Sequence, residues 1–251
     1  MTRPDALLRE LQRSDSARPR ITCYDDTDGP AGGERIELSA RVLSNWVAKA
    51  ANALQEDYDV EPGSVVLLAL PPHWRTAYWA VAVWAVGGCV ALDLSEDADL
   101  CVSDDRALLA DFVDRSGAGA GAVLVTLPAL ARRSPDEVPD GVMDEAAQLA
   151  TYADQFEPWA EADDDDPALT VGGERITYGR LLADAASAVG ADIGPLTPGA
   201  RAHVSTYDTA LFLSVLLGAW AVDGSVVLSR GEPTAEALAG RLLTEGVTHT
   251  L

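Results

Sequence analysis

The chain has 251 residues, 48% of them hydrophobic, and carries 40 acidic against 18 basic residues for a net charge of -22. This hydrophobic content, with a mean hydropathy of +0.04, excludes a disordered chain and predicts a folded core with the charge on its surface. An acidic surface repels phosphate backbones and anionic lipids, so we expect neither nucleic-acid nor membrane partners.

The N-terminus and the cysteines predict a reduced cytoplasmic environment. Residues 1–10 lack the apolar segment of a signal peptide. Cys23, Cys89 and Cys101 have no CxxC spacing, and the histidines show no ligand spacing. We therefore expect buried thiols, no zinc site and a cytoplasmic location.

The first predicted elements run from a Gly32-Gly33 turn to a short strand near residue 90. Apolar residues at three- and four-residue steps predict a helix over residues 42–54, and a Pro-Gly turn precedes a buried strand at Val65–Leu70. The uncharged stretch Thr76–Leu92 approaches the length of a membrane span. Its Gly87-Gly88 pair instead predicts a helix that ends at Val86, followed by a strand.

Aromatic spacing in the same helix predicts core packing. Trp74, Trp79 and Trp84 recur at fivefold steps that no single helical face accommodates, which favours packing between helices over a cofactor site.

The middle of the chain is predicted to connect two halves. An Ala-rich helix and an apolar strand at Ala122–Thr126 precede a polar stretch over residues 134–166. This stretch ends in Asp163-Asp164-Asp165-Asp166, which is typical of a solvated charge run, although consecutive carboxylates can also bind a divalent cation.

A sequence repeat organises the whole chain. Gly32–Ile36 recurs as Gly172–Ile176, and Trp84–Leu92 recurs as Trp220–Leu228 with six of nine residues identical between the copies. In the second copy Thr177 is a candidate N-cap, and Arg201–Ser205 is the matching buried strand. A helix long enough to cross over between two strands implies parallel pairing.

The repeat leads to a fold class and a domain division. We predict an α/β protein with two pseudo-repeated parallel or mixed β-sheet halves, with helices packed between and around them. The predicted division is a first αβ subdomain over residues 1–133, an acidic connector over 134–166, and a second αβ subdomain over 167–251 that repeats about 32–94.

The order of these motifs resembles the N-terminal part of the adenylate-forming superfamily, which includes AMP-binding acyl-CoA synthetases, luciferases and peptide-synthetase adenylation domains. The matching motifs are Gly33-Glu34-Arg35, Glu61-Pro62-Gly63, Leu68–Pro71, Ala85–Leu92 and Val247-Thr248-His249. The resemblance implies a truncated acetyl-CoA synthetase-like N-terminal domain. It extends to truncated, AMP-binding-like actinobacterial proteins of unknown role.

The superfamily's phosphate-binding loop, Thr-Ser-Gly-Thr-Thr-Gly-x-Pro-Lys-Gly, corresponds in position to Asp166–Arg175. Gly172 and Gly173 are the candidate nucleotide-binding residues there, with a structural hairpin shared by both copies as the alternative. Glu174 would repel a phosphate. Lys49, the only lysine, lies in the first copy, so the loop lysine and the family's C-terminal catalytic lysine both lack a counterpart. The chain also ends before the family's adenine-binding and metal-binding segments.

Two strand-to-helix junctions are the candidate pocket positions. His73 and Trp74 follow the first buried strand, and Thr206 and Asp208 follow its repeat, at the sheet edge where open parallel sheets bind ligands. The alternative for His73 is a residue that starts a helix. Asp208 falls near the position of the family's aromatic-pocket histidine.

These features predict a degenerate adenylate-forming-like protein that has no catalytic residues, no metal and no resident cofactor. AMP or ATP is implied by the resemblance alone. We expect it to bind a small molecule or a protein. The alternatives are ligase activity through a non-standard site or one completed by a second chain, and a homodimer formed through an apolar face.

Overall fold

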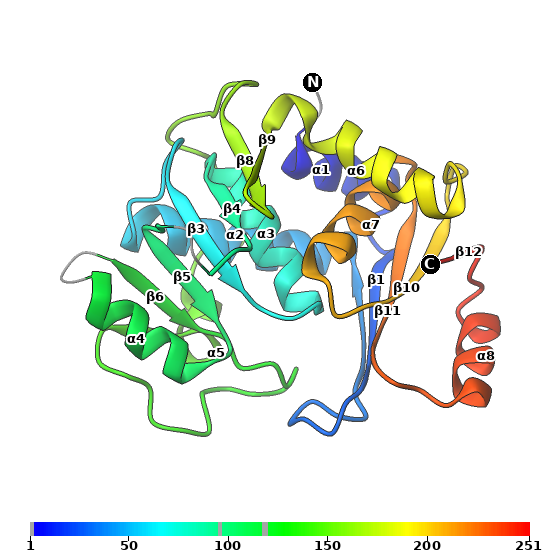
Figure 1. The fold of residues 1–251 in the computed structure, drawn as a ribbon, viewed down its shortest axis with the longest axis horizontal. Coiled ribbons are helices and arrows are strands. Elements are labelled where there is room, and N and C mark those ends of the chain that lie inside the picture. The colour runs from blue at the N-terminus through cyan, green and yellow to red at the C-terminus, as the bar shows by residue number, and fades with distance from the viewer. Residues whose placement is uncertain (1–2, 95–96, 117–119) are drawn as a thin grey trace. The chain divides into compact units, whose positions relative to one another are not determined.

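The computed structural model describes residues 3–94, 97–116 and 120–251, which form two mixed β-sheets and their associated helices (Figure 1). The helices are α1 (Pro4–Asp15), α2 (Ala40–Asp57), α3 (Trp74–Val86), α4 (Arg106–Ser116), α5 (Glu145–Gln148), the 3-10 helix η1 (Leu149–Thr151), α6 (Tyr178–Ile193), α7 (Thr209–Ala221) and α8 (Ala235–Thr244). The predicted α/β class is confirmed.

The seven-stranded sheet has the order β7-β6-β5-β3-β4-β8-β9. Its strands, in that order, are Val142–Asp144, Gly121–Leu124, Leu100–Ser103, Val65–Ala69, Cys89–Ala91, Pro167–Val171 and Glu174–Thr177. Every pair is parallel except the β8–β9 hairpin. Its central strands read as continuous apolar runs because both of their faces are buried. Helix α4 lies against β5 and β6 (Figure 1).

The five-stranded sheet has the order β12-β10-β11-β1-β2. Its strands, in that order, are His249–Thr250, Arg201–Ser205, Ser225–Gly231, Pro19–Asp26 and Arg35–Ser39. The pairs are parallel except for the β1–β2 hairpin. Helix α7 packs on β10 and β11 and also contacts α1. These pairings confirm the parallel strands predicted from the repeat.

The two sequence copies fold alike but exchange their hairpins. Each copy runs hairpin, helix, strand, helix, strand: β1, β2, α2, β3, α3 and β4 in the first copy, and β8, β9, α6, β10, α7 and β11 in the second. The hairpin of the first copy pairs with β11 of the second, and the hairpin of the second pairs with β4 of the first. Each sheet therefore contains strands from both copies.

The chain accordingly clusters into two compact units that interleave along the sequence. Among the described residues, unit 1 consists of those in 45–70 and 78–181, and unit 2 consists of 3–44, 71–77 and 182–251. Neither unit coincides with residues 1–133 or 167–251, because the exchanged hairpins carry part of each copy into the other copy's sheet.

The predicted helix end at Val86 is confirmed. Helix α3 stops there and β4 begins at Cys89. Gly87 adopts φ +91, a left-handed conformation that favours glycine. A side chain at this position would also clash, because a Cβ on Gly87 would lie 2.9 Å from the Pro62 side chain. In the second copy, α6 begins at Tyr178, directly after the candidate cap Thr177.

The repeated tryptophans bind equivalent β-bulges. Both hairpins carry a register shift, at Arg20 in β1 and at Ala168 in β8. The indole N–H of Trp84 donates to the Ala168 carbonyl at 2.7 Å, and that of Trp220 donates to the Arg20 carbonyl at 3.3 Å. Trp79 and Trp84 are fully buried and Trp74 nearly so, as the predicted core packing requires.

The polar stretch over residues 134–166 contributes more structure than its composition predicts. It supplies the edge strand β7 and lies along α2, where Lys49, Asn52 and Gln55 form a row at three-residue steps. Lys49 donates to the carbonyls of Ala150 and Tyr152, and Asn52 and Gln55 donate to carbonyls of residues 153, 155 and 157. We call residues 150–159 the α2 strap. Its acceptors are main-chain carbonyls, which leave no trace in side-chain periodicity.

The three cysteines are buried and reduced, as predicted. Burial raises the pKa of Cys23 and of Cys101 to about 12, so both thiols remain protonated. Within the described ranges, every helix is too short or too polar to cross a bilayer. The same residues contain no group of three or more His, Cys, Asp or Glu side chains placed to hold a metal ion.

Candidate functional site

The segment Asp166–Arg175, where the resemblance predicts a phosphate-binding loop, lies in the β8–β9 hairpin. Val171 pairs directly with Glu174, so Gly172 and Gly173 alone form the turn. Their φ angles are +59 and +77, the left-handed values of the tight two-residue turns that close β-hairpins. Both glycines are therefore required by the backbone of the turn itself.

The electrostatics of this turn are unfavourable for a phosphate. The Gly173 N–H donates to Oδ2 of Asp93 at 3.1 Å, so a carboxylate already occupies that amide. Glu174, the next residue, is exposed and adds a second negative charge. A phosphate at the turn would have to displace Asp93 and would meet like charge.

Lys49 is committed to the α2 strap. Its ammonium group donates to two carbonyl oxygens and forms a 2.8 Å ion pair with Asp154. Its role is structural, because it holds the strap against α2.

His73 and Trp74 lie at the start of α3, as predicted, and both are buried. The His73 Nδ1 atom accepts the Arg75 backbone N–H at 3.3 Å, which places the ring over the first turn of the helix. Burial, together with the positive charges of Arg230 and Arg75, lowers the pKa of His73 well below 6.5. The imidazole is therefore neutral. The Trp74 ring lies 4.4 Å from the Arg75 guanidinium.

Thr206 and Asp208 form the equivalent turn before α7. Asp208 is the N-cap residue, and its carboxylate accepts the backbone N–H groups of Ala210 and Leu211 at 2.8 and 3.2 Å. The Thr206 hydroxyl accepts the Asp208 N–H at 2.9 Å. Both side chains thus shape the helix start, a role that Asp208 signals in sequence through its place just before an apolar helix.

Sequence reasoning missed a charged network on one face of the five-stranded sheet. Glu245, which follows α8, accepts hydrogen bonds from Tyr24, Arg35 and Arg201. Burial by itself would raise the pKa of Glu245, but these hydrogen bonds outweigh burial and lower it to about 2. The carboxylate is therefore ionised at neutral pH and joins three strands to the end of α8.

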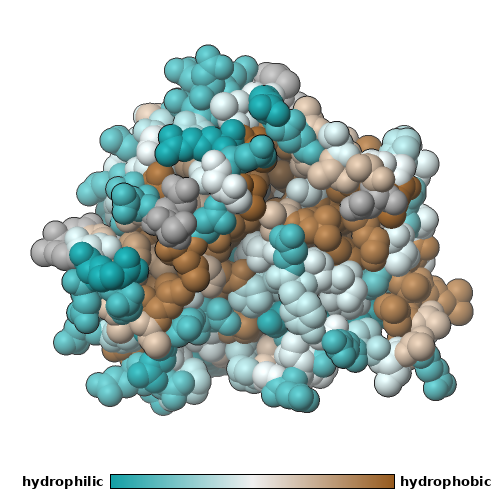
Figure 2. Space-filling model, viewed as in Figure 1, coloured by the Kyte–Doolittle hydropathy of each residue, from teal (hydrophilic) through white to brown (hydrophobic). Residues whose placement is uncertain are grey.

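Arg241 attaches α8 to the same face. It forms an ion pair with Asp26 at 2.8 Å, donates to the Ser229 hydroxyl at 2.6 Å, and lies 3.9 Å from the centre of the Tyr24 ring. Leu243 on this helix is 85% exposed, and Figure 2 shows apolar side chains at the right-hand edge where α8 lies. Charged and aromatic contacts therefore hold α8 against the five-stranded sheet. The sequence around Arg241 does not indicate these contacts, because Asp26 and Tyr24 lie more than 200 residues away.

His203 contributes a pH-dependent element to this network. Its Nε2 atom lies 2.9 Å from the Ser229 hydroxyl, and the ring is 1% exposed. Burial and the nearby Arg241 charge lower the pKa of His203 to about 4. A buried neutral imidazole beside an arginine disfavours protonation.

We therefore predict that acid destabilises the protein through His203. Between pH 6.5 and 4 the unfolded chain binds a proton that folded His203 excludes, so stability falls as pH falls. This proton accounts for a loss of about 3 kcal/mol across that interval. Urea unfolding at a series of pH values should show a shallower loss for His203→Asn than for the wild type. Parallel curves for the two proteins would contradict the prediction.

Comparison with known proteins places the chain in a family and a fold class. No family model matches the sequence. The chain is 35% identical over 249 residues to a "TIGR03089 family protein" of Mycobacterium tuberculosis, covering 98% of this chain and 96% of that protein.

Solved structures share the fold at low identity. The acyl-CoA synthetase of Brucella canis has a TM-score of 0.75 at 17% identity, and the acetoacetyl-CoA synthetase of Streptomyces lividans has 0.74 at 19%. The amide bond synthetase McbA of Marinactinospora thermotolerans has 0.66 at 16%. Each match covers 99% of this chain but only 46%, 42% and 48% of the respective neighbour. The predicted acetyl-CoA synthetase-like N-terminal fold is confirmed, and by its identity to the mycobacterial protein the chain belongs to the TIGR03089 family.

Proposed function

We propose that this protein keeps the AMP-binding fold without adenylation activity and acts as a binding module for a small molecule or a protein. The observation that carries the proposal is the two-residue β8–β9 turn in place of a phosphate-binding loop. Adenylyl transfer requires donors and cations aimed at the charge that develops on phosphorus. A turn whose Gly173 amide is bound to the Asp93 carboxylate supplies neither.

The position of the single lysine supports the same proposal. A phosphate-binding loop uses a lysine to neutralise the triphosphate. Lys49 is held by two carbonyls and Asp154 at the α2 strap, and moving it would break those contacts.

Pyrophosphate exchange tests the absence of adenylation. We expect the purified protein, incubated with ATP, Mg²⁺ and panels of fatty and amino acids, to exchange no more pyrophosphate than a protein-free blank. The acetoacetyl-CoA synthetase of Streptomyces lividans, with its own acid substrate, serves as the positive control. Exchange that follows the protein peak through gel filtration and depends on one acid would overturn the proposal.

A variant of Asp93 tests whether the turn has no phosphate site at all or has one that the Asp93 carboxylate blocks. Asp93→Asn removes the charge that accepts the Gly173 amide and leaves the hairpin in place. We expect ATP with Mg²⁺ to leave the thermal midpoint of both the wild type and this variant unchanged, because the turn still lacks the loop lysine and Glu174 still repels the triphosphate. Stabilisation of the variant alone would reveal a latent nucleotide site and would favour ligase activity through a non-standard site.

A further inference from the structure

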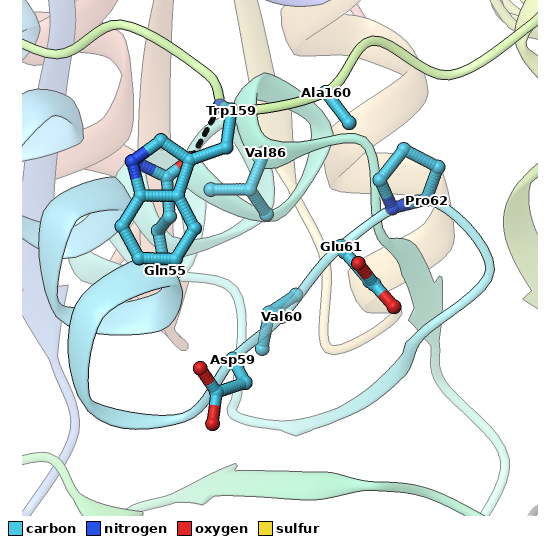
Figure 3. A pocket seen from close by; sticks show the side chains of 8 residues that line it. All are labelled: Gln55, Asp59, Val60, Glu61, Pro62, Val86, Trp159 and Ala160. Carbon is cyan, nitrogen blue, oxygen red and sulfur yellow. Dashed lines mark hydrogen bonds between the residues drawn. The ribbon is translucent and has the colours of Figure 1, made fainter.

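A small cavity in unit 1 lies between the α2 strap, the end of α3 and the loop after α2 (Figure 3). Its volume is about 130 Å³. Ligand pockets for drug-sized molecules run to about 300–1,000 Å³, whereas a cavity of about 150 Å³ holds one benzene. The cavity therefore fits a chemical group the size of one side chain and is too small for a nucleotide.

Trp159 forms one wall of the cavity, and its backbone is anchored there. Its side chain is 71% exposed, yet its backbone N–H donates to Oε1 of buried Gln55 at 2.8 Å. The Gln55 amide in turn donates to the Glu157 carbonyl at 3.3 Å. Figure 3 shows the hydrogen bond from the Trp159 backbone to the Gln55 side chain. Because the backbone of this segment is already anchored, a ligand that binds the ring does not have to order the main chain.

The remaining walls are apolar or acidic. Val60 and Val86 are buried and line the interior, while Asp59 and Glu61 are exposed on the loop opposite Trp159. No lysine or arginine lines the cavity, and among the described residues neither carboxylate belongs to a salt bridge.

This combination selects for positive charge. The face of an indole ring attracts a cation, most strongly when apolar walls limit the cation's contact with water. Two carboxylates at the rim add favourable charge at low ionic strength. A neutral or anionic group of the same size gains neither contribution.

We propose that this cavity binds a single organic cation of side-chain size, a guanidinium or alkylammonium group, against the ring of Trp159 and the carboxylates of Asp59 and Glu61. The same chemistry can come from a free small cation or from an arginine side chain of a partner. The inference does not depend on the loss of adenylation, because the cavity and the β8–β9 turn share no residue.

The direct test is a titration followed at the Trp159 indole N–H in ¹H–¹⁵N spectra, with the signal assigned by its loss in Trp159→Leu. The probe is N-acetyl-arginine amide, and its control is N-acetyl-citrulline amide, which has nearly the same shape without the charge. We expect the arginine probe to shift the signal with millimolar affinity, the citrulline probe to leave it unmoved, and added salt to weaken binding.

Matched variants separate the cavity from the overall negative charge of the protein. Asp59→Asn with Glu61→Gln should weaken binding of the arginine probe about threefold or more. Asp163→Asn with Asp165→Asn removes the same two charges from exposed positions outside the cavity lining, and should leave the affinity unchanged. Dispersed amide spectra of each variant establish that it remains folded.

Several results would overturn the proposal. One is equal shifts from the arginine and citrulline probes, another is equal weakening by the two charge-matched double variants, and a third is no shift at any millimolar concentration. If the probe does bind, an Ala-Arg-Ala peptide distinguishes the source of the cation. Tighter binding of the peptide than of the single amino-acid amide supports a protein partner, and equal binding supports a free small cation.

Discussion

Trp84→Ala is expected to lower the free energy of unfolding by about 3–5 kcal/mol, the range for truncating a buried aromatic side chain. The side chain is fully buried, so its removal leaves a cavity in the core. It also removes the donor bound to the Ala168 carbonyl at the β8 bulge, which ties α3 to the exchanged hairpin. Guanidinium unfolding at fixed pH measures the change.

Two related variants test the reason for this effect. Trp84→Phe retains most of the apolar volume and loses the N–H donor, so its cost should lie well below that of the alanine variant. Trp220→Ala removes the repeat-related indole at the Arg20 bulge and should destabilise by a comparable amount. A loss below about 1 kcal/mol for Trp84→Ala would show that the core closes around the missing ring.

Arg20→Ala is expected to destabilise the protein by at least about 3 kcal/mol, because buried carbonyls lose their donor and a cavity remains. The Arg20 side chain is fully buried. It donates to the carbonyls of Asp223, Gly224 and Leu11 and forms a 2.9 Å ion pair with Asp223. Its burial lowers the pKa of its guanidinium, which reflects the cost of keeping this charge out of water. Chemical denaturation is again the measurement.

Arg18 provides a matched control for Arg20. It donates to the same Asp223 carbonyl and to the Gly199 carbonyl, but its side chain is 34% exposed, so water replaces much of what is lost. We expect Arg18→Ala to cost about 1 kcal/mol or less. Equal effects of the two substitutions would mean that burial does not set the contribution of Arg20.

The predictions for Trp84 and Arg20 both concern the exchanged hairpins. The hairpin of each copy pairs with a strand of the other copy. A bulge follows the first residue of each hairpin. Trp84 and Trp220 cap these two bulges with the same N–H donor. The two residues that the sequence marks as repeated thus bind the segments that join the two copies.

The site shows how far sequence reasoning extends. The position of the phosphate-binding loop was predicted from motif order, and the closed hairpin found there follows from the Gly-Gly pair and the flanking strands. The junction residues His73 and Asp208 were found at the predicted helix starts. The partners of Gly173, Lys49 and Glu245 were not predictable, because Asp93, the strap carbonyls and the arginines lie far away in sequence.

By itself, the sequence of this protein determined the kinds of elements, their approximate limits, and the duplication. Hydrophobic periodicity, helix-ending glycines and turn residues act over a few neighbouring positions, and they can therefore be recognised in the sequence. The tertiary structure alone decided the exchange of hairpins, the α2 strap, the charged attachment of α8 and the Trp159 cavity. These features depend on contacts between segments that are distant in sequence. Many of the acceptors are main-chain carbonyls, which every residue carries, so the residue types do not predict these contacts.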